Sequence, residues 1–275
     1  MNFRTDLAVE AAVNRPVDAE DVEQNSRKIG TLVLHTTRIL TPAGEEAVGK
    51  PRGRYIAAEF PTLTDNEQDL AAHAAAIGKE LAGMLPPEGT VLVVGLGNRT
   101  VTPDALGPAT TDLTLATRHI RGEFARSAGL NDLRPTAVLA PGVLGQTGTE
   151  SSETVRGVCR EIHPAAVIVI DALAAGDASR LGRTVQMTDS GIAPGSGVGN
   201  NCRPLNREVL GVPVIGVGVP TVVDAVLDGT TPLMVTPKEV DLMISRAARL
   251  LAMSIHAALQ PGYAPMELVE VARGM

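Results

Sequence analysis

Three short runs of apolar, mostly β-branched residues limit the folds that this chain can adopt. They lie at residues 91–94, 167–170 and 212–219, and each leads into a stretch containing glycine, proline or aspartate. Such runs are typical of strands buried on both faces of a parallel sheet. Segments with apolar residues at helical spacing lie between them, which indicates βαβ units. The pattern therefore predicts an α/β fold with a twisted, mostly parallel sheet and helices on both faces.

Length and charge narrow the class of protein further. The 275 residues show neither an internal repeat nor a linker, so we expect one domain. The formal net charge of −7 argues against direct nucleic-acid binding, which needs a basic surface. Neither a secretory signal nor a bilayer-spanning apolar run is apparent. Cys159 and Cys202 are too few for a disulfide framework and are expected to be reduced. These features predict a cytoplasmic protein with no membrane partner.

Weaker patterns predict the other elements. Residues 31–41 and 55–60 are expected to pair as antiparallel strands joined by a turn-rich connector, whereas residues 1–30 are polar and suggest only a short helix or a frayed end. Further strands are expected near residues 137–140 and 184–187, and an irregular loop over 189–201. Helices are expected over residues 64–81, 106–119, 151–162 and 237–259.

Several familiar kinds of site are disfavoured by the sequence. Gly95 and Gly97 follow a strand, but Thr100 stands where a dinucleotide-binding loop needs its third glycine. No P-loop, no pair of histidines at helical spacing and no GxSxG sequence occurs, which argues against nucleotide, zinc and serine-hydrolase sites. Ser196 lies between glycines and is interpreted as a flexible loop serine. Neither cysteine has a histidine near it in sequence.

Two aspartates remain as candidates for chemistry. Asp104 follows the strand at residues 91–94 after a turn, and Asp171 follows the strand at residues 167–170 directly. Because parallel strands end at the same edge of a sheet, both carboxyl groups are expected there, and neighbouring strands are only about 5 Å apart. Paired carboxyl groups shift each other's pKa and can activate water and protonate a leaving amine. The alternatives are helix N-caps, or a divalent metal ion held between them; Asp189 and Asp224 are secondary candidates.

Longer motifs resemble one protein family. The chain is similar to the spore germination proteases, or gpr endopeptidases, in motifs that follow the family's order and cover most of the sequence. The matching stretches are RTDLAVEA at 4–11, VVGLGNRTVTPDALGP at 93–108, TRHI at 117–120, APGVLGQTGTESSE at 140–153, VIDALAA at 169–175, QMTDSGIAPGSGVGN at 186–200, GVPVIGVGVPTVVDA at 211–225 and VTPKEVD at 235–241.

The resemblance implies a specific activity. Members of the family are endopeptidases of an atypical aspartic type, made as zymogens that process themselves, and they begin the degradation of small acid-soluble DNA-binding spore proteins during germination. The family's two acids fall on Asp104 and Asp171. Its self-cleavage falls between Asp6 and Leu7, which implies a propeptide of residues 1–6 and a single α/β protease domain of residues 7–275. Relatives form homotetramers, and the implied location is the cytoplasm of the forespore or the spore core.

The same resemblance implies a fold like that of hydrogenase maturation proteases, of the phosphorylase/hydrolase-like kind. Two glycine-rich loops are expected to offer backbone N–H groups to a peptide or an oxyanion; the candidates are Gly142, Gly145, Gly148, Gly195 and Gly197. No cofactor is expected, although a divalent metal between Asp104 and Asp171 is left open. Two alternatives stand beside this interpretation: a non-catalytic peptide-binding or scaffold module of the same fold, and a metal-dependent maturation-type protease.

Overall fold

One mixed sheet forms the centre of the molecule. The computed structural model describes residues 18–61, 63, 69–120, 122, 127, 130, 132–194, 203–227 and 231–274. Within them the strand order is β1-β2-β3-β7-β8-β6-β4-β5, and β9 pairs with β8 off this path. The strands are β1 (Val22–Ile29), β2 (Leu32–Ile39), β3 (Gly53–Glu59), β4 (Val91–Gly95), β5 (Thr136–Leu139), β6 (Ala166–Ala175), β7 (Thr184–Thr188), β8 (Val214–Leu227) and β9 (Thr231–Val235).

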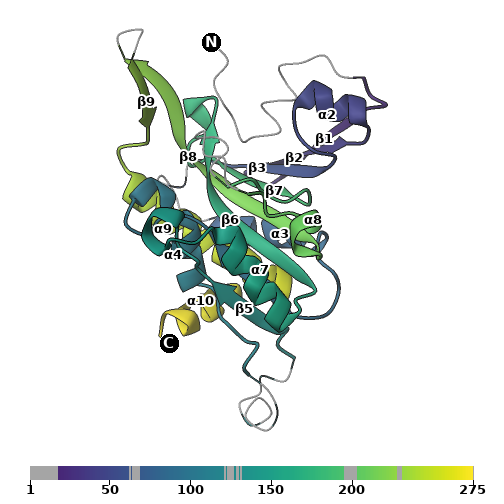
Figure 1. Cartoon of the computed structure of the whole chain (residues 1–275), viewed down its shortest axis with the longest axis vertical. Coiled ribbons are helices and arrows are strands. Elements are labelled where there is room, and N and C mark those ends of the chain that lie inside the picture. Colours follow the sequence, from purple (N-terminus) through teal and green to yellow (C-terminus); the bar gives the residue numbers. More distant parts are fainter. Residues whose placement is uncertain are drawn as a thin grey trace.

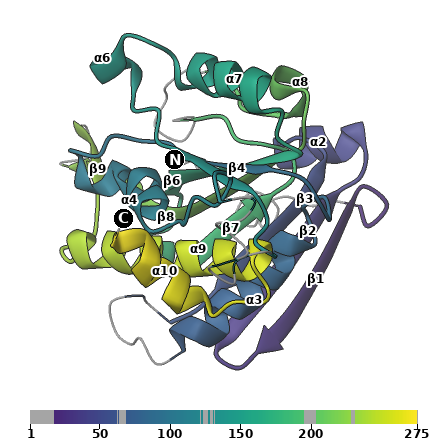
Figure 2. The ribbon, with the colours of Figure 1, turned by 90° about the horizontal axis from the view of Figure 1, so that it is seen from below.

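Helices cover both faces of this sheet. The helices and 3-10 turns are α2 (Pro42–Val48), α3 (Leu70–Ala82), η1 (Thr102–Asp104), α4 (Leu106–Asp112), α6 (Leu144–Thr147), α7 (Ser151–Ile162), η2 (Ala178–Arg180), α8 (Arg207–Leu210), α9 (Val240–Leu259) and α10 (Pro265–Arg273). Figure 2 shows α7 and α8 on one side of the sheet and α3, α9 and α10 on the other. The predicted α/β class, with helices on both faces, is confirmed.

Alternate residues of a buried strand pack on opposite faces of the sheet. In β6, Ile168 and Ile170 belong to the core cluster under α3 and α9, whereas Val167 and Val169 pack with Val155 of α7. Successive residues of a strand point to opposite faces, so a strand covered on both sides must be apolar throughout. This is why the runs at residues 91–94 and 167–170 read as continuous apolar segments.

The sheet is less parallel than the sequence predicts. Among the described strands, the pairings β4–β5, β4–β6 and β6–β8 are parallel. The other five pairings are antiparallel. The βαβ pattern correctly indicates the parallel part, including the strand at residues 137–140. The remaining pairings are antiparallel. At one edge lie β1, β2 and β3, and the pairing of β2 with β3 confirms the antiparallel pair expected for residues 31–41 and 55–60. Strand β9 pairs with the end of β8, off the main path of the sheet.

The differences along the chain have local causes. The expected connector contains α2, whose start is marked by Pro42 and the capping side chain of Thr41, and whose end is Gly49 with φ +72°. Strand β1 was not predicted because only Val22 in it is buried, as suits an edge strand. The helix expected over residues 106–119 stops at Asp112. The strand beginning at Val214 continues to Leu227 and forms a hairpin with β9 that projects from the body in Figure 1.

Helix α9 lies in the core. Its 20 residues are long and apolar enough to cross a membrane by length and composition, but 67% of the apolar window is buried inside the protein. It packs closely on α3, since a Cβ at Gly78 would lie 2.7 Å from Ala257 Cβ. It is also anchored by His256, whose ring accepts a hydrogen bond from Leu115 N–H at 3.0 Å. The apolar residues of α9 are thus used for packing on the sheet and on α3.

Candidate active site

Gly95 and Gly97 allow the chain after β4 to turn back across the end of the strand. A Cβ at Gly95 would lie 2.2 Å from the carbonyl oxygen of Gly107. Gly97 has φ +113°, and a Cβ there would lie 2.0 Å from the carbonyl oxygen of Asp104. Real side chains do not tolerate such contacts, and φ in this range favours glycine. The glycines therefore bring η1, with Asp104 at its end, directly against the end of β4.

A backbone donor holds the carboxyl group of Asp104. Oδ2 of Asp104 accepts a hydrogen bond from Asn98 N–H at 2.7 Å. The side chain of Asn98 is held in turn, because its Oδ1 accepts a hydrogen bond from Gln146 Nε2 at 2.8 Å. Burial raises the pKa of Asp104 above its usual value, and the hydrogen bond from Asn98 opposes this. Helix α4 has Ala105 as its N-cap and no side-chain cap bond, so Asp104 does not act as the N-cap of that helix.

Asp171 lies within a strand rather than after one. Strand β6 continues to Ala175, and Asp171 pairs with Gly218 of β8. Its residue is 6% exposed, and its Oδ1 accepts a hydrogen bond from Ala172 N–H at 2.9 Å. The expectation that the strand ends at Asp171 is therefore wrong, and no helix begins there for Asp171 to cap. The longer strand arises because β8 also continues and supplies backbone partners on that side.

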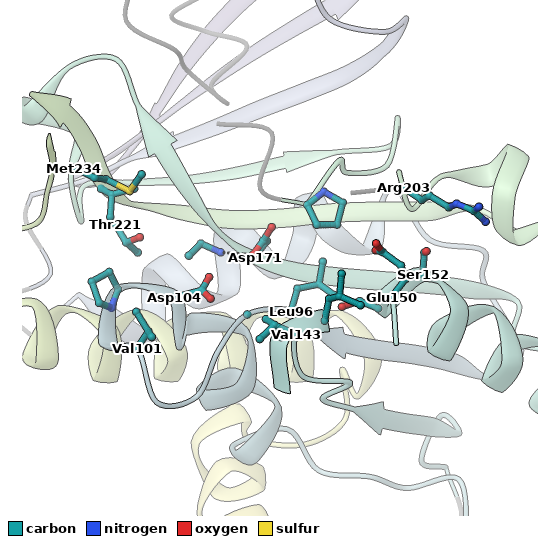
Figure 3. A pocket seen from close by; sticks show the side chains of 18 of the residues that line it. Leu96, Val101, Asp104, Val143, Glu150, Ser152, Asp171, Arg203, Thr221 and Met234 are labelled. Atoms are coloured by element: carbon teal, nitrogen blue, oxygen red, sulfur yellow. Dashed lines mark hydrogen bonds between the residues drawn. The ribbon is translucent and has the colours of Figure 1, made fainter. Parts of the chain in front are cut away.

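The structure brings the two predicted acids to one cavity. Gly95 pairs with Ile170, and Leu96 N–H donates to Ile170 O at 2.8 Å, so the end of β4 lies beside Asp171. Asp104 and Asp171 both line a cavity of about 690 Å³. Figure 3 shows both carboxyl groups in the central part of this cavity. Asp171 also borders a smaller pocket of about 180 Å³ on the β7 side.

The rest of the cavity wall is apolar, with a few polar groups. Leu96, Val101, Val143 and Met234 are among its apolar residues, and Glu150 and Arg203 are charged residues at its border. Two hydroxyl groups were not singled out as functional from the sequence. They belong to Thr221 in β8 and Ser152 in α7, and both are buried with no hydrogen-bond partner among the described residues. Their residue types carry no signal of this, because it depends on long-range packing.

The other predicted site residues fall into three groups. Gly145 borders the cavity, whereas Gly142 and Gly148 do not; the N–H of Gly148 donates to Leu144 O, which leaves it unable to donate to a substrate. Asp189 and Asp224 are likewise absent from the cavity wall, and Oδ1 of Asp189 accepts from Arg54 N–H at 2.7 Å. Six further residues named from the sequence lie outside the described part of the chain: Asp6, Leu7, Gly195, Ser196, Gly197 and Cys202.

Within the described part of the chain, no group of three or more His, Cys, Asp and Glu side chains is placed to hold a metal ion. The two acidic groups in the middle of the cavity are the carboxyl groups of Asp104 and Asp171. A half-buried carboxyl group with a raised pKa, in the same cavity as a second acid, is an arrangement that general acid–base chemistry uses.

A family model and the curated relatives agree on one family. A family model described as Germination protease matches residues 5–231. A germination protease of Clostridium perfringens is 37% identical over 313 aligned residues, covering 94% of this chain and 96% of the relative. A germination protease of Caldanaerobacter subterraneus is 37% identical over 319 residues, covering 98% of this chain and 97% of the relative. Among solved structures, a NiFe hydrogenase maturation protease, HycI from Thermococcus kodakarensis, has a TM-score of 0.40 and 20% identity, covering 64% of this chain and 98% of that one.

Proposed function

The chain belongs to the germination protease family, and from that premise we propose that it is an endopeptidase in which Asp104 and Asp171 together activate a water molecule. The observation that carries this proposal is that the two acids, 67 positions apart by their numbers (171 − 104), line the same cavity. Neither side chain caps a helix, which was the structural alternative for each. A cavity of about 690 Å³ is within the usual size range of substrate pockets.

The two acids take different roles in the proposed mechanism. We assign the shared proton to Asp104, whose pKa is raised by burial and lowered by the hydrogen bond from Asn98 N–H. Asp171 accepts a proton from the water as the water oxygen bonds to the peptide carbonyl carbon. Asp104 then gives its proton to the amide nitrogen as the C–N bond breaks. The proton on Asp171 returns the pair to its starting state, so that no net proton is lost or gained.

The loop that follows β5 is suited to hold the peptide. Gly145 lies in the first turn of α6, where backbone N–H groups lack an acceptor within the helix. It borders the cavity, and the same short helix is tied to the Asp104 turn by the bond from Gln146 to Asn98. We assign Gly145 as a backbone donor to the substrate. Gly195 and Gly197 are assigned the same role from the family resemblance alone.

The substrate class and the processing step also rest on the family. The chain is assigned small acid-soluble spore proteins as substrates, and its net charge of −7 suits basic, DNA-binding partners. It is assigned self-cleavage between Asp6 and Leu7, which releases a propeptide of residues 1–6 from the protease domain. A homotetramer in the forespore or spore core completes the proposal. Its chemistry needs no metal ion between the acids.

Replacement of each acid by its amide tests the dyad. Asp104→Asn and Asp171→Asn are each expected to lower the rate of cleavage of a purified small acid-soluble spore protein by about 10²–10⁴-fold. Asp224→Asn is the matched control, because Asp224 lies on β8 outside the cavity wall. A near-normal rate in either of the first two variants would refute the assignment. Self-processing is tested by intact-mass measurement, which detects the loss of the first six residues. Metal dependence is tested with EDTA: activity that is lost in EDTA and restored by a divalent ion would favour a metal-dependent protease instead.

A further inference from the structure

A β-bulge places Thr221 at the wall of the cavity. In the pairing of β6 with β8, Leu173 lies opposite Pro220 and Ala174 lies opposite Val222, so Thr221 is the extra residue. Bulges often occur next to active sites, where they redirect a side chain. The backbone at this point is held from the other side, because Thr236 Oγ1 donates to Thr221 O at 2.8 Å. This hydrogen bond joins the bulge in β8 to the segment that follows β9.

The hydroxyl group of Thr221 has no partner. The residue is 0% exposed, and its Oγ1 makes no hydrogen bond with the described residues. A buried polar group left in this way costs about 1–3 kcal/mol, whereas valine would fill the same space without that cost. Because solvent does not reach the hydroxyl, a bulk water molecule does not satisfy it. The hydroxyl of Thr221 is therefore a donor that remains available to a group at the cavity wall.

Asp104 is the acceptor that the fold brings to this wall. The η1 turn that carries Asp104 packs against β8, and Thr221 and Asp104 line the same cavity. Figure 3 shows them on the same side of that cavity. Asn98 N–H binds Oδ2 of Asp104, and Oδ1 has no hydrogen-bond partner among the described residues. The other ionisable residues around the cavity are Asp171, Glu150 and Arg203.

We propose that Thr221 is a positioning residue that donates a hydrogen bond to Oδ1 of Asp104 when Asp104 gives up its proton during peptide hydrolysis. This inference rests on the proposed function of the two acids. In the resting state the protonated carboxyl group does not need the extra donor, so the hydroxyl remains unpaired. When the proton moves to the leaving amine, Asp104 becomes a carboxylate, and a second donor stabilises it. Thr221 keeps its own proton throughout, and the balance of the reaction is unchanged.

Thr221→Val tests the proposal, since it removes the hydroxyl and preserves the β-branched shape. We expect kcat on a purified small acid-soluble spore protein to fall about 10- to 100-fold with KM unchanged, because hydrogen bonds to charged groups are the stronger class. A donor to the ionised form lowers the pKa of an acid, so its loss is expected to move the alkaline limb of the kcat profile to higher pH. Thr221→Ser is expected to restore both properties.

Stability separates this role from an ordinary structural one. Thr221→Val is expected to keep or raise the thermal midpoint, because it removes an unpaired buried hydroxyl; a lower midpoint would contradict the interpretation. Thr37→Val, at a buried threonine of β2 away from the cavity, controls for the substitution itself. A kcat within twofold of the unmodified chain, an unmoved alkaline limb, or no rescue by serine overturns the proposal. Asp104→Asn in the same assay separates failure of the proposed function from failure of this inference. If Asp104→Asn is active, the proposed function fails. If Asp104→Asn is inactive and Thr221→Val has normal activity, only this inference fails.

Discussion

His256 makes the stability of this protein depend on pH. It lies in α9 and is 2% exposed. Its Nε2 accepts a hydrogen bond from Leu115 N–H, and its Nδ1 lies 3.3 Å from Pro265 O. These partners fit the neutral ring with its proton on Nδ1. Burial is the main cause that lowers the pKa of His256 from 6.5 to about 4. The side chain thus connects the segment after α4, the core helix and the start of α10, and protonation of the ring removes its bond with Leu115 N–H.

The size of the effect follows from these two pKa values. Between pH 6.5 and pH 4 the unfolded chain binds a proton at this site more readily than the folded chain, so stability rises with pH. The contribution is fully present above pH 6.5 and is lost as the pH falls towards 4. Proton linkage with pKa values of 6.5 and about 4 gives a loss of about 2 kcal/mol between pH 7.5 and pH 5.0.

Urea unfolding of the protein and of His256→Gln at pH 7.5 and pH 5.0 measures the contribution of His256 to stability. The variant is expected to be less stable at pH 7.5, because Leu115 N–H loses its buried acceptor. The difference in unfolding free energy between the two proteins is expected to shrink by about 2 kcal/mol at pH 5.0, since only the unmodified chain loses the histidine contribution. His119→Gln, at an exposed histidine, controls for the substitution itself. A difference for His256→Gln that stays constant within about 0.5 kcal/mol would refute the reasoning.

Two further predictions concern the turn that carries Asp104. Gly97→Ala is expected to abolish protein cleavage and to destabilise the fold by about 1–3 kcal/mol, because at φ +113° its Cβ would collide with the Asp104 carbonyl. Gly49→Ala, at φ +72° with open space around it, is the control and is expected to retain activity. Equal activity of the two variants would contradict the argument. Asp104→Asn is expected to be more stable than the unmodified chain at pH 7, because burial raises the pKa of the acid and its ionisation opposes folding as the pH rises above 3.8. Melting curves at pH 4 and pH 7 test this, and an equal gain at both would argue against the raised pKa.

The sequence and the comparisons agree on the family, and the sequence also anticipates much of the parallel part of the fold. The strands β4 and β6 were predicted from apolar runs, and the glycine turn was predicted to place Asp104. The antiparallel pair of β2 and β3 was also expected, whereas β1 and β9 were not. Strand β1 has one buried residue, and β9 is defined by its pairing with β8. Edge strands of this kind have few buried residues, so their hydrophobic pattern is weak even where their pairing is extensive.

Some features of the candidate site could also be predicted from the sequence, and others could not. Its acids and glycines could be named from the sequence, because a sharp turn after a buried strand needs specific residue types, and carboxyl groups are few at such places. The position of Asp171 in the middle of β6 and the bulge at Thr221 depend on the pairing of β6 with β8. The raised pKa of Asp104 and the unpaired hydroxyl of Thr221 depend on burial by segments distant in the chain. The sequence by itself identified Asp104 and Asp171 as candidates for chemistry, whereas the tertiary structure decided their surroundings, because burial and hydrogen-bond partners come from long-range packing.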